Sequence, residues 1–246
     1  MKCWICPQDA ISREHIIKKS DIVRFYGRAP YKGIRGLAHV KAGKITSIQG
    51  PDSKKIKYNP SLCHHCNTTL TQPFDRAYDV FVDYVFRNEQ EIIRKRYIDF
   101  ADVYGDDFDA QQCDLFRYFA KSFGCRLADI QISVPSDVVN ILKVRPFETA
   151  LSINFCINTD VLLLPKSVRD GFIGKGDLVA SLDKKYSNEV NGYYWDENIS
   201  WLFLHYWYNT EVDGDKGSKW LADNRHIYLG EIAPLPEGER ARLKGE

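Results

Sequence analysis

The sequence lacks any run of about 18 apolar residues, the length that a helix needs to cross a bilayer. Its N-terminus also lacks the apolar core of a signal peptide. We therefore expect a cytoplasmic protein without a membrane partner. No repeat or low-complexity tract is present. With 44% hydrophobic and 27% charged residues among 246, the chain has enough apolar material for a packed core, which excludes disordered and fibrous proteins.

Acidic residues are scarce in the N-terminal segment 1–70. This segment holds 13 Lys and Arg residues against only Asp9, Glu14, Asp21 and Asp52, which is a net charge of +9. Since the whole chain carries +1, residues 71–246 carry −8. Near-neutrality of the whole chain would argue against a nucleic-acid-binding protein. The basic surplus of the N-terminal segment removes that objection.

Four of the seven cysteines form two Cys-x-x-Cys pairs. Cys3 and Cys6 make the first pair and Cys63 and Cys66 the second, with the segment 7–62 between them. Four thiolates in two such turns can surround one tetrahedral Zn²⁺ ion, so we predict a structural zinc site. The alternatives are buried, unrelated thiols and a redox-active pair. Disulfides are not expected in a cytoplasmic protein.

The pattern of apolar and turn residues predicts an α+β fold. Before Cys66 we expect a strand hairpin over 37–48 and no helix of ordinary length. Helices are predicted beyond Cys66, at 71–96, 109–123 and 135–142. Strands of a mixed or antiparallel sheet are predicted at 151–157, 177–182, 201–208 and 226–232. The residues from Pro236 onward read as a polar tail.

Aromatic residues are dense in the C-terminal part of the chain. Dense aromatics in strands are typical of a core, although exposed rings could stack nucleic-acid bases. The residues concerned are Tyr193, Tyr194, Trp195, Trp201, Tyr206, Trp207 and Tyr208.

The motifs around the cysteines resemble those of the zinc-containing HNH endonucleases, whose catalytic module is a ββα-metal finger. The resemblance rests on an ordered series of motifs: Cys3-x-x-Cys6, Glu14-His15-Ile16-Ile17, and Asn59-Pro-Ser-Leu-Cys63-x-x-Cys66-Asn67 before a predicted helix. It covers about a third of the chain. It implies a nuclease domain over 1–80 and an α+β accessory domain of unassigned role over 81–246.

The resemblance also implies roles for individual residues. His15 matches the general base that activates water, and an ordinary pKa near 6.5 suits an imidazole to that task. Glu14 matches the ligand of a catalytic divalent ion, Mg²⁺ or Mn²⁺. Asn59 matches the middle Asn of the family, which fixes the loop around the base, and we expect it to contact substrate. Asn67 matches the Asn that follows the last cysteine, and it is an alternative to Asp75 as a catalytic residue on the metal side.

One position departs from the family pattern. Many HNH proteins carry a His or Asn metal ligand four residues past the last cysteine, where this sequence has Leu70. A leucine side chain has no atom that can bind a metal. Asp75, in the first turn of the predicted helix, is the best replacement, and Asp79 lies one turn further on.

The basic residues of the N-terminal segment favour a phosphate-binding surface over a merely solvated one. Arg13, Lys18 and Lys19 adjoin the Glu-His pair and are the predicted substrate contacts. The others are Arg24, Arg28, Lys32, Arg35, Lys41, Lys44, Lys54, Lys55 and Lys57. Because no base-reading motif is visible, we expect DNA binding without sequence preference. The sequence motifs of the expected finger contain no feature that distinguishes a DNA substrate from an RNA substrate.

These patterns together predict a metal-dependent HNH endonuclease that hydrolyses DNA phosphodiester bonds. A role in restriction or anti-phage defence is an analogy with other small HNH proteins, and a homodimer that cuts both strands is compatible with it. The alternative is a non-catalytic zinc module that binds nucleic acid or a protein partner. Leu70 at a ligand position favours this alternative.

Overall fold

The structure is a computed structural model that describes residues 1–28, 30–31, 37–41, 43–145, 148–182, 189–210 and 219–244. They form two compact units. The first unit comprises residues 1–70 and 125–133, and the second comprises 71–124 and 134–246. The division falls within helix α5 (Phe108–Asp129). The expected functional boundary at residue 80 stays a prediction.

The first unit contains short elements. They are α1 (Lys19–Tyr26), the antiparallel strands β1 (Leu37–Lys41) and β2 (Lys44–Ile48), and the single turns η2 (Lys54–Ile56) and η3 (Cys66–Leu70). The hairpin confirms the expectation for 37–48. Helix α1 was not expected, because it is short and has no side-chain cap at its start. Its apolar face stabilises it: Ile22 is buried with Ile48 and Ile56 against Tyr26.

The second unit contains most of the helices. Their bounds are α2 (Gln72–Arg87), α3 (Glu89–Lys95), α4 (Phe100–Tyr104), α5 up to Gly124, α6 (Ser136–Ile141), α7 (Lys166–Arg169) and α8 (Glu237–Lys244), with the turns η4 (Gly105–Asp107) and η5 (Val161–Leu163). None of the described helices has the length and apolar character needed to cross a membrane.

Two helix predictions and the expected polar tail need correction. The helix expected over 71–96 is interrupted at Asn88, whose side-chain amide donates to the carbonyl of Tyr84 and competes with the backbone pattern. The helix expected to end before Gly124 continues to Asp129, because Phe123 and Leu127 on either side are fully buried. That packing outweighs a cost of about 1 kcal/mol for a glycine inside a helix. The expected polar tail contains α8.

A seven-stranded mixed sheet forms the centre of the second unit. Its strand order is β11-β4-β8-β7-β5, with β6 also paired to β7 and β9 to β4. The bounds are β4 (Leu151–Ile157), β5 (Ile173–Lys175), β6 (Val179–Leu182), β7 (Val190–Ile199), β8 (Leu202–Asn209), β9 (Lys219–Trp220) and β11 (Gly230–Glu231). A separate ribbon pairs β3 (Tyr97–Asp99) with β10 (His226–Tyr228). The sequence did not predict β7, and the strand expected over 226–232 is divided between β10 and β11.

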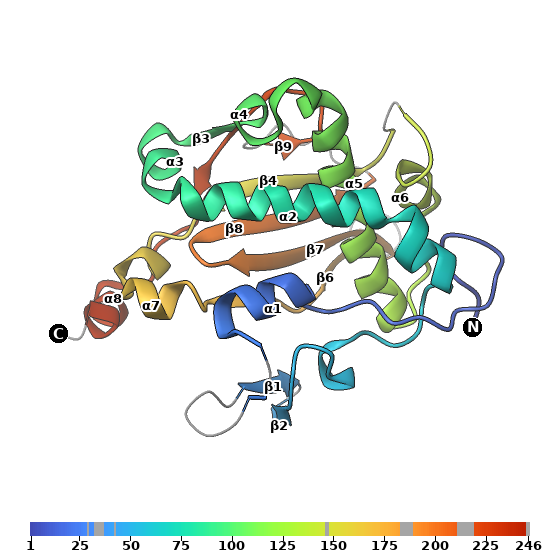
Figure 1. Ribbon diagram of the computed structural model, residues 1–246, viewed down its shortest axis with the longest axis horizontal. Coiled ribbons are helices and arrows are strands. Elements are labelled where there is room, and N and C mark those ends of the chain that lie inside the picture. The colour runs from blue at the N-terminus through green and yellow to red at the C-terminus, as the bar shows by residue number, and fades with distance from the viewer. Residues whose placement is uncertain are drawn as a thin grey trace. The chain divides into compact units, whose positions relative to one another are not determined.

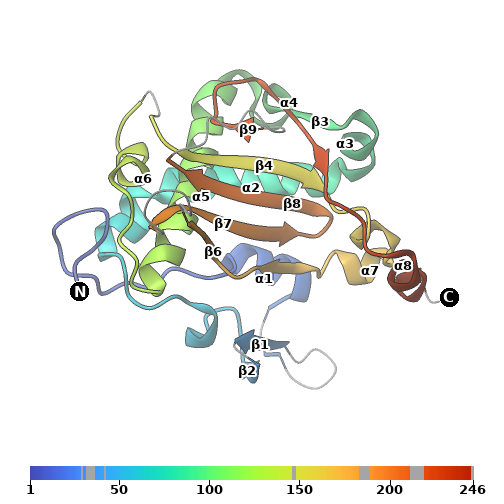
Figure 2. The same cartoon turned by 180° about the vertical axis from the view of Figure 1, so that it is seen from behind.

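The core of the second unit lies between this sheet and two helices. Figure 1 shows α2 and the N-terminal part of α5 crossing one face of the sheet. In the opposite view of Figure 2, the strands β4, β8 and β7 lie in front of these helices. Phe119 of α5 is fully buried and packs edge-to-face on Phe155, Tyr206 and Trp220. These aromatic contacts fasten the helix layer to the sheet.

The aromatic residues of the sheet divide by face. Trp195 and Tyr206 are buried, as is Trp201 in the turn that joins β7 to β8, and this confirms the prediction of core positions. Tyr194 and Trp207 alternate with them and are only half-buried. The structure therefore bears out an α+β fold, whereas the ββα-metal finger stays a prediction.

Candidate functional site

The four cysteines of the two Cys-x-x-Cys pairs converge in the first unit. Their sulfur atoms all lie within 4.8 Å of one another, and the Cys6 sulfur is 3.6 Å from those of Cys63 and Cys66. A tetrahedral zinc ion with Zn–S bonds of about 2.3 Å requires sulfur atoms about 3.8 Å apart. The donor set and its spacing therefore fit a metal such as zinc.

Backbone contacts build the two turns that carry these thiols. The amide of Cys3 donates to the carbonyl of Gln8, and the amide of Cys66 donates to the Cys63 sulfur at 3.3 Å. The amide of Trp4 donates to the carbonyl of Ser61, so the first turn is held against the segment that leads into the second. These backbone hydrogen bonds hold the two Cys-x-x-Cys turns close together without the help of a metal ion.

All four cysteines are free thiols, and their sulfur atoms are too far apart for a disulfide bond of about 2.05 Å. Burial acts to raise the pKa of Cys63, but the Cys66 amide and the neighbouring thiols offset it, and the pKa lies below its ordinary value. Burial and the neighbouring thiols raise the pKa of Cys66. Because a metal binds thiolates, its binding to this group releases the remaining protons and strengthens as the pH rises.

The Glu-His pair lies on a short stretch of chain that pairs antiparallel with the segment before the second cysteine pair. Isolated bridges join Ser12 to Leu62 and His15 to Lys57. Between them, the amide of Tyr58 donates to the carbonyl of Glu14 at 2.9 Å. The motif residues before Cys63 therefore lie beside the motif residues after Cys6.

His15 is held in one orientation. Its side chain is 17% exposed, and its Nε2 lies 3.1 Å from the carbonyl oxygen of Pro51. Because a carbonyl oxygen only accepts, Nε2 donates its proton there and Nδ1 keeps the lone pair of the neutral ring. Burial and the charge of Lys57 lower the pKa of His15, against the opposing charges of Glu14 and Asp52. The pKa shift favours the neutral ring.

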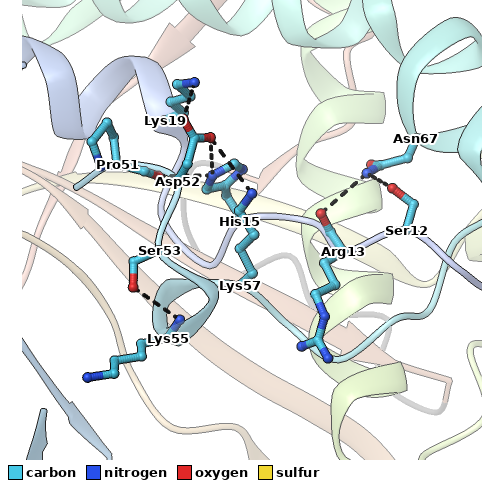
Figure 3. A network of polar contacts seen from close by, with 10 residues as sticks. All are labelled: Ser12, Arg13, His15, Lys19, Pro51, Asp52, Ser53, Lys55, Lys57 and Asn67. Carbon is cyan, nitrogen blue, oxygen red and sulfur yellow. Dashed lines mark hydrogen bonds and ion pairs between the residues drawn. The ribbon is translucent and has the colours of Figure 1, made fainter. Parts of the chain in front are cut away.

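Asp52 is the meeting point of the positive groups around His15 (Figure 3). Its Oδ2 lies 2.5 Å from the Lys19 ammonium, and its Oδ1 lies 3.8 Å from the Lys57 ammonium and 4.0 Å from His15 Nε2. The hydrogen bond from Lys19 lowers the pKa of Asp52, and the charges of Lys19, Lys57 and His15 act in the same direction. Asp52 is therefore ionised at neutral pH.

Two residues of the motif hold this segment in place. Asn67 donates from its side-chain amide to the Ser12 hydroxyl at 2.8 Å and to the Arg13 carbonyl at 3.4 Å. Asn67 thus positions the chain that leads into Glu14 and His15. The exposed side chain of Arg13 also donates to the carbonyl of Tyr58.

The remaining predicted contacts are at the surface or outside the described residues. The backbone amide of Asn59 donates to Asp129, and Asn59 itself is exposed. Lys18 caps α1 with its backbone and is half-buried. Among the other basic residues, Lys32, Arg35 and the side chain of Lys41 lie outside the described part of the chain.

Asp75 belongs to the second unit. The ammonium of Lys121 lies 3.4 Å from both of its carboxylate oxygens, and the Lys121 side chain is only 2% exposed. Lys121 also donates to the hydroxyl of Thr71, the residue before α2. Within the described residues, the four cysteines are the one group of three or more potential metal-binding side chains close together. That part of the chain thus shows no preformed cluster around Glu14 or Asp75.

Comparison with protein families, curated proteins and solved structures finds no match to this chain.

Sequence reasoning missed the parts that Asp52, Pro51 and Lys57 play at the site. The sequence Gly-Pro-Asp-Ser at 50–53 is typical of a turn and indicates nothing more, and Lys57 is one of many basic residues in the segment. A signal was present, since Asp52 is one of few acidic residues in a basic segment and is followed closely by three lysines. No local pattern, however, indicates that this turn reaches His15, which lies far earlier in the chain.

Proposed function

We propose that this protein is an HNH-type endonuclease that hydrolyses DNA phosphodiester bonds. The observation that carries the proposal is the oriented imidazole of His15, whose Nε2 donates to Pro51 and whose Nδ1 is left to accept a proton. A carbonyl partner that fixes one ring nitrogen is the arrangement that prepares the other as a general base. The four-cysteine group beside the same backbone pairing supports the zinc part of the motif.

The residues around His15 supply the remaining requirements of the reaction. A water molecule deprotonated at Nδ1 attacks phosphorus, and the departing 3′ oxygen leaves with a proton from solvent. Glu14 is half-buried next to His15, and one carboxylate with substrate oxygens and water is a donor set that Mg²⁺ accepts. Such an ion, when bound, stabilises negative charge on the phosphate. Arg13, Lys18 and Lys19 would contact neighbouring phosphates.

A nicking assay on supercoiled plasmid with Mg²⁺ or Mn²⁺ tests the proposal. We expect the wild-type protein to relax the plasmid and His15→Ala to lower the rate by at least about 100-fold, because general bases contribute factors of that order. His226→Gln is the control, because it removes a half-exposed histidine from the second unit. Equal rates for wild type and His15→Ala, or no cleavage at high protein concentration, would contradict the nuclease proposal. Parallel DNA and RNA duplexes establish the substrate.

The second candidate is a zinc module that binds nucleic acid without cleaving it. Two observations favour it: Leu70 stands at the family's ligand position, and the substitute Asp75 is engaged by Lys121. Salt-dependent DNA binding without nicking under any metal condition is the outcome that this candidate requires.

A further inference from the structure

The groups around Asp52 have the composition of an anion site. Two ammonium groups, those of Lys19 and Lys57, approach opposite oxygens of one carboxylate, and the edge of the His15 ring lies beside one of those oxygens. Lysines are common phosphate ligands, and a carboxylate presents two anionic oxygens to such cations as a phosphodiester does. Figure 3 shows all three side chains directed toward Asp52.

We propose that Lys19, Lys57 and the edge of His15 form a binding site for one DNA phosphate, and that Asp52 fills this site in the free protein. The proposal rests on the proposed nuclease function and adds Lys57 as a substrate-binding residue. It also makes Asp52 an internal competitor of the substrate. When DNA binds, a phosphate takes the place of the carboxylate, and the Asp52 side chain rotates into solvent, while the Pro51 carbonyl stays on Nε2 of His15.

Replacing the Asp52 carboxylate by a phosphate costs little free energy where Asp52 leaves Lys19. Its side chain is 62% exposed and that of Lys19 is 51% exposed, so water solvates both ions when they separate. Exposed ion pairs of this kind add little to stability. Lys57 is different, since its side chain is only 20% exposed. Its ammonium is therefore already positioned beside His15 when the carboxylate leaves.

The acidic residue is also unusual for its surroundings. A surface that binds phosphates gains affinity from each lysine it presents, and an aspartate among them removes two of these contacts. Asp52 therefore weakens DNA binding at the position closest to the proposed base. This loss of affinity makes binding more selective, because DNA must also contact the other basic residues of the first unit before it can displace Asp52.

The test is the affinity of Asp52→Asn for a short labelled DNA duplex, measured by fluorescence anisotropy without added divalent ion. We expect binding about tenfold tighter at about 50 mM salt, and a plot of log affinity against log salt that is steeper by about one to two, because two lysines become available. Combining Asp52→Asn with Lys57→Gln should remove most of the gain. Lys57→Gln alone, which keeps the turn intact, should weaken binding about fivefold.

Asp9→Asn is the matched control. Asp9 is also an exposed aspartate of the first unit that pairs with one lysine, Lys2, at 2.8 Å. Its substitution changes the net charge equally and is expected to change the affinity by less than about twofold. Binding of Asp52→Asn that equals wild type, or an equal gain in Asp9→Asn, would overturn the proposal. If Asp52→Asn binds more tightly but no variant nicks plasmid, the phosphate site stands and the nuclease function fails.

Discussion

Asp99 links the two strands of the β3–β10 ribbon through charge. Its carboxylate accepts two hydrogen bonds from the Arg225 guanidinium, at 2.8 and 2.7 Å, and lies 3.2 Å from His226 Nε2. It also caps α4 by accepting from the amide of Ala101. The hydrogen bonds from Arg225 are the largest cause that lowers the pKa of Asp99 to about 2. The ionised form is therefore favoured by folding.

The sign of the pH effect follows from that pKa. A carboxyl whose pKa is depressed in the folded state adds stability above its unfolded value of about 3.9, and this contribution is lost as the pH falls toward 2. We expect Asp99→Asn to lower the free energy of unfolding at pH 7 by about 1–2 kcal/mol, a figure reduced because Arg225 is half-exposed. Urea unfolding of both proteins at pH 7 and at about pH 2 measures this difference in the free energy of unfolding.

The pH 2 measurement is the discriminating one. There the wild type and Asp99→Asn should differ much less in stability, because the carboxyl is largely protonated in the unfolded chain and half protonated in the folded one. Asp106→Asn, at an exposed position in η4, is the control and should have little effect at either pH. A difference at pH 7 that persists unchanged at pH 2 would show that Asp99 acts through packing and not through its charge.

At the scale of elements, the fully buried ring of Phe119 joins α5 both to the sheet and to α2. Phe119 contacts Tyr78 of α2 as well as Phe155 of β4 and Tyr206 of β8. We expect Phe119→Ala to lower the free energy of unfolding by about 3–5 kcal/mol, because the cavity lies between several elements and cannot collapse.

The matched control is Phe172→Ala, which truncates a ring that is 43% exposed before β5. It should cost less than about 1 kcal/mol. Chemical unfolding followed by far-ultraviolet circular dichroism compares the two variants. A cost for Phe119→Ala as small as that of Phe172→Ala would contradict the packing described here.

The elements also show where sequence patterns sufficed. The strand at 151–157 follows from alternating apolar residues, which is a local signal. The start of the helix at 72 follows from Thr71, a residue type that favours the N-cap position, and from Pro73 in the first turn, where a missing amide costs little. The side chain of Thr71, however, does not cap the helix and instead accepts a hydrogen bond from Lys121. The continuation of α5 through Gly124 depends on packing with distant residues. Local helix propensity does not depend on those distant contacts, so it could not predict the continuation.

At the scale of the whole molecule, the four-cysteine group joins segments far apart in the chain, so a metal held there would couple its binding to the folding of the first unit. We expect about one zinc ion per purified chain and well under one in Cys63→Ser. Cys156→Ser, at a lone cysteine of the second unit, should keep its zinc. Metal analysis by mass spectrometry distinguishes these outcomes.

Zinc removal should also affect the two units differently. With a strong chelator, we expect hydrogen exchange in residues 1–70 to accelerate by at least about tenfold, while β4 and β8 keep their protection, because the second unit has its own aromatic core. Zinc content well under one ion per chain in the wild type, or equal protection of residues 1–70 with and without chelator, would contradict a structural zinc site.

Residue types and spacings were enough to predict the α+β class, the division of charge near residue 70 and the group of four cysteines that could hold a metal, whereas His15 as the base stays a prediction. These features depend on composition and short-range periodicity, which are local. Only the folded chain shows that the turn at Pro51 and Asp52 meets His15, and that Asp75 pairs with Lys121. Those contacts join residues far apart in sequence, and their energies depend on burial and distance, which no local pattern contains.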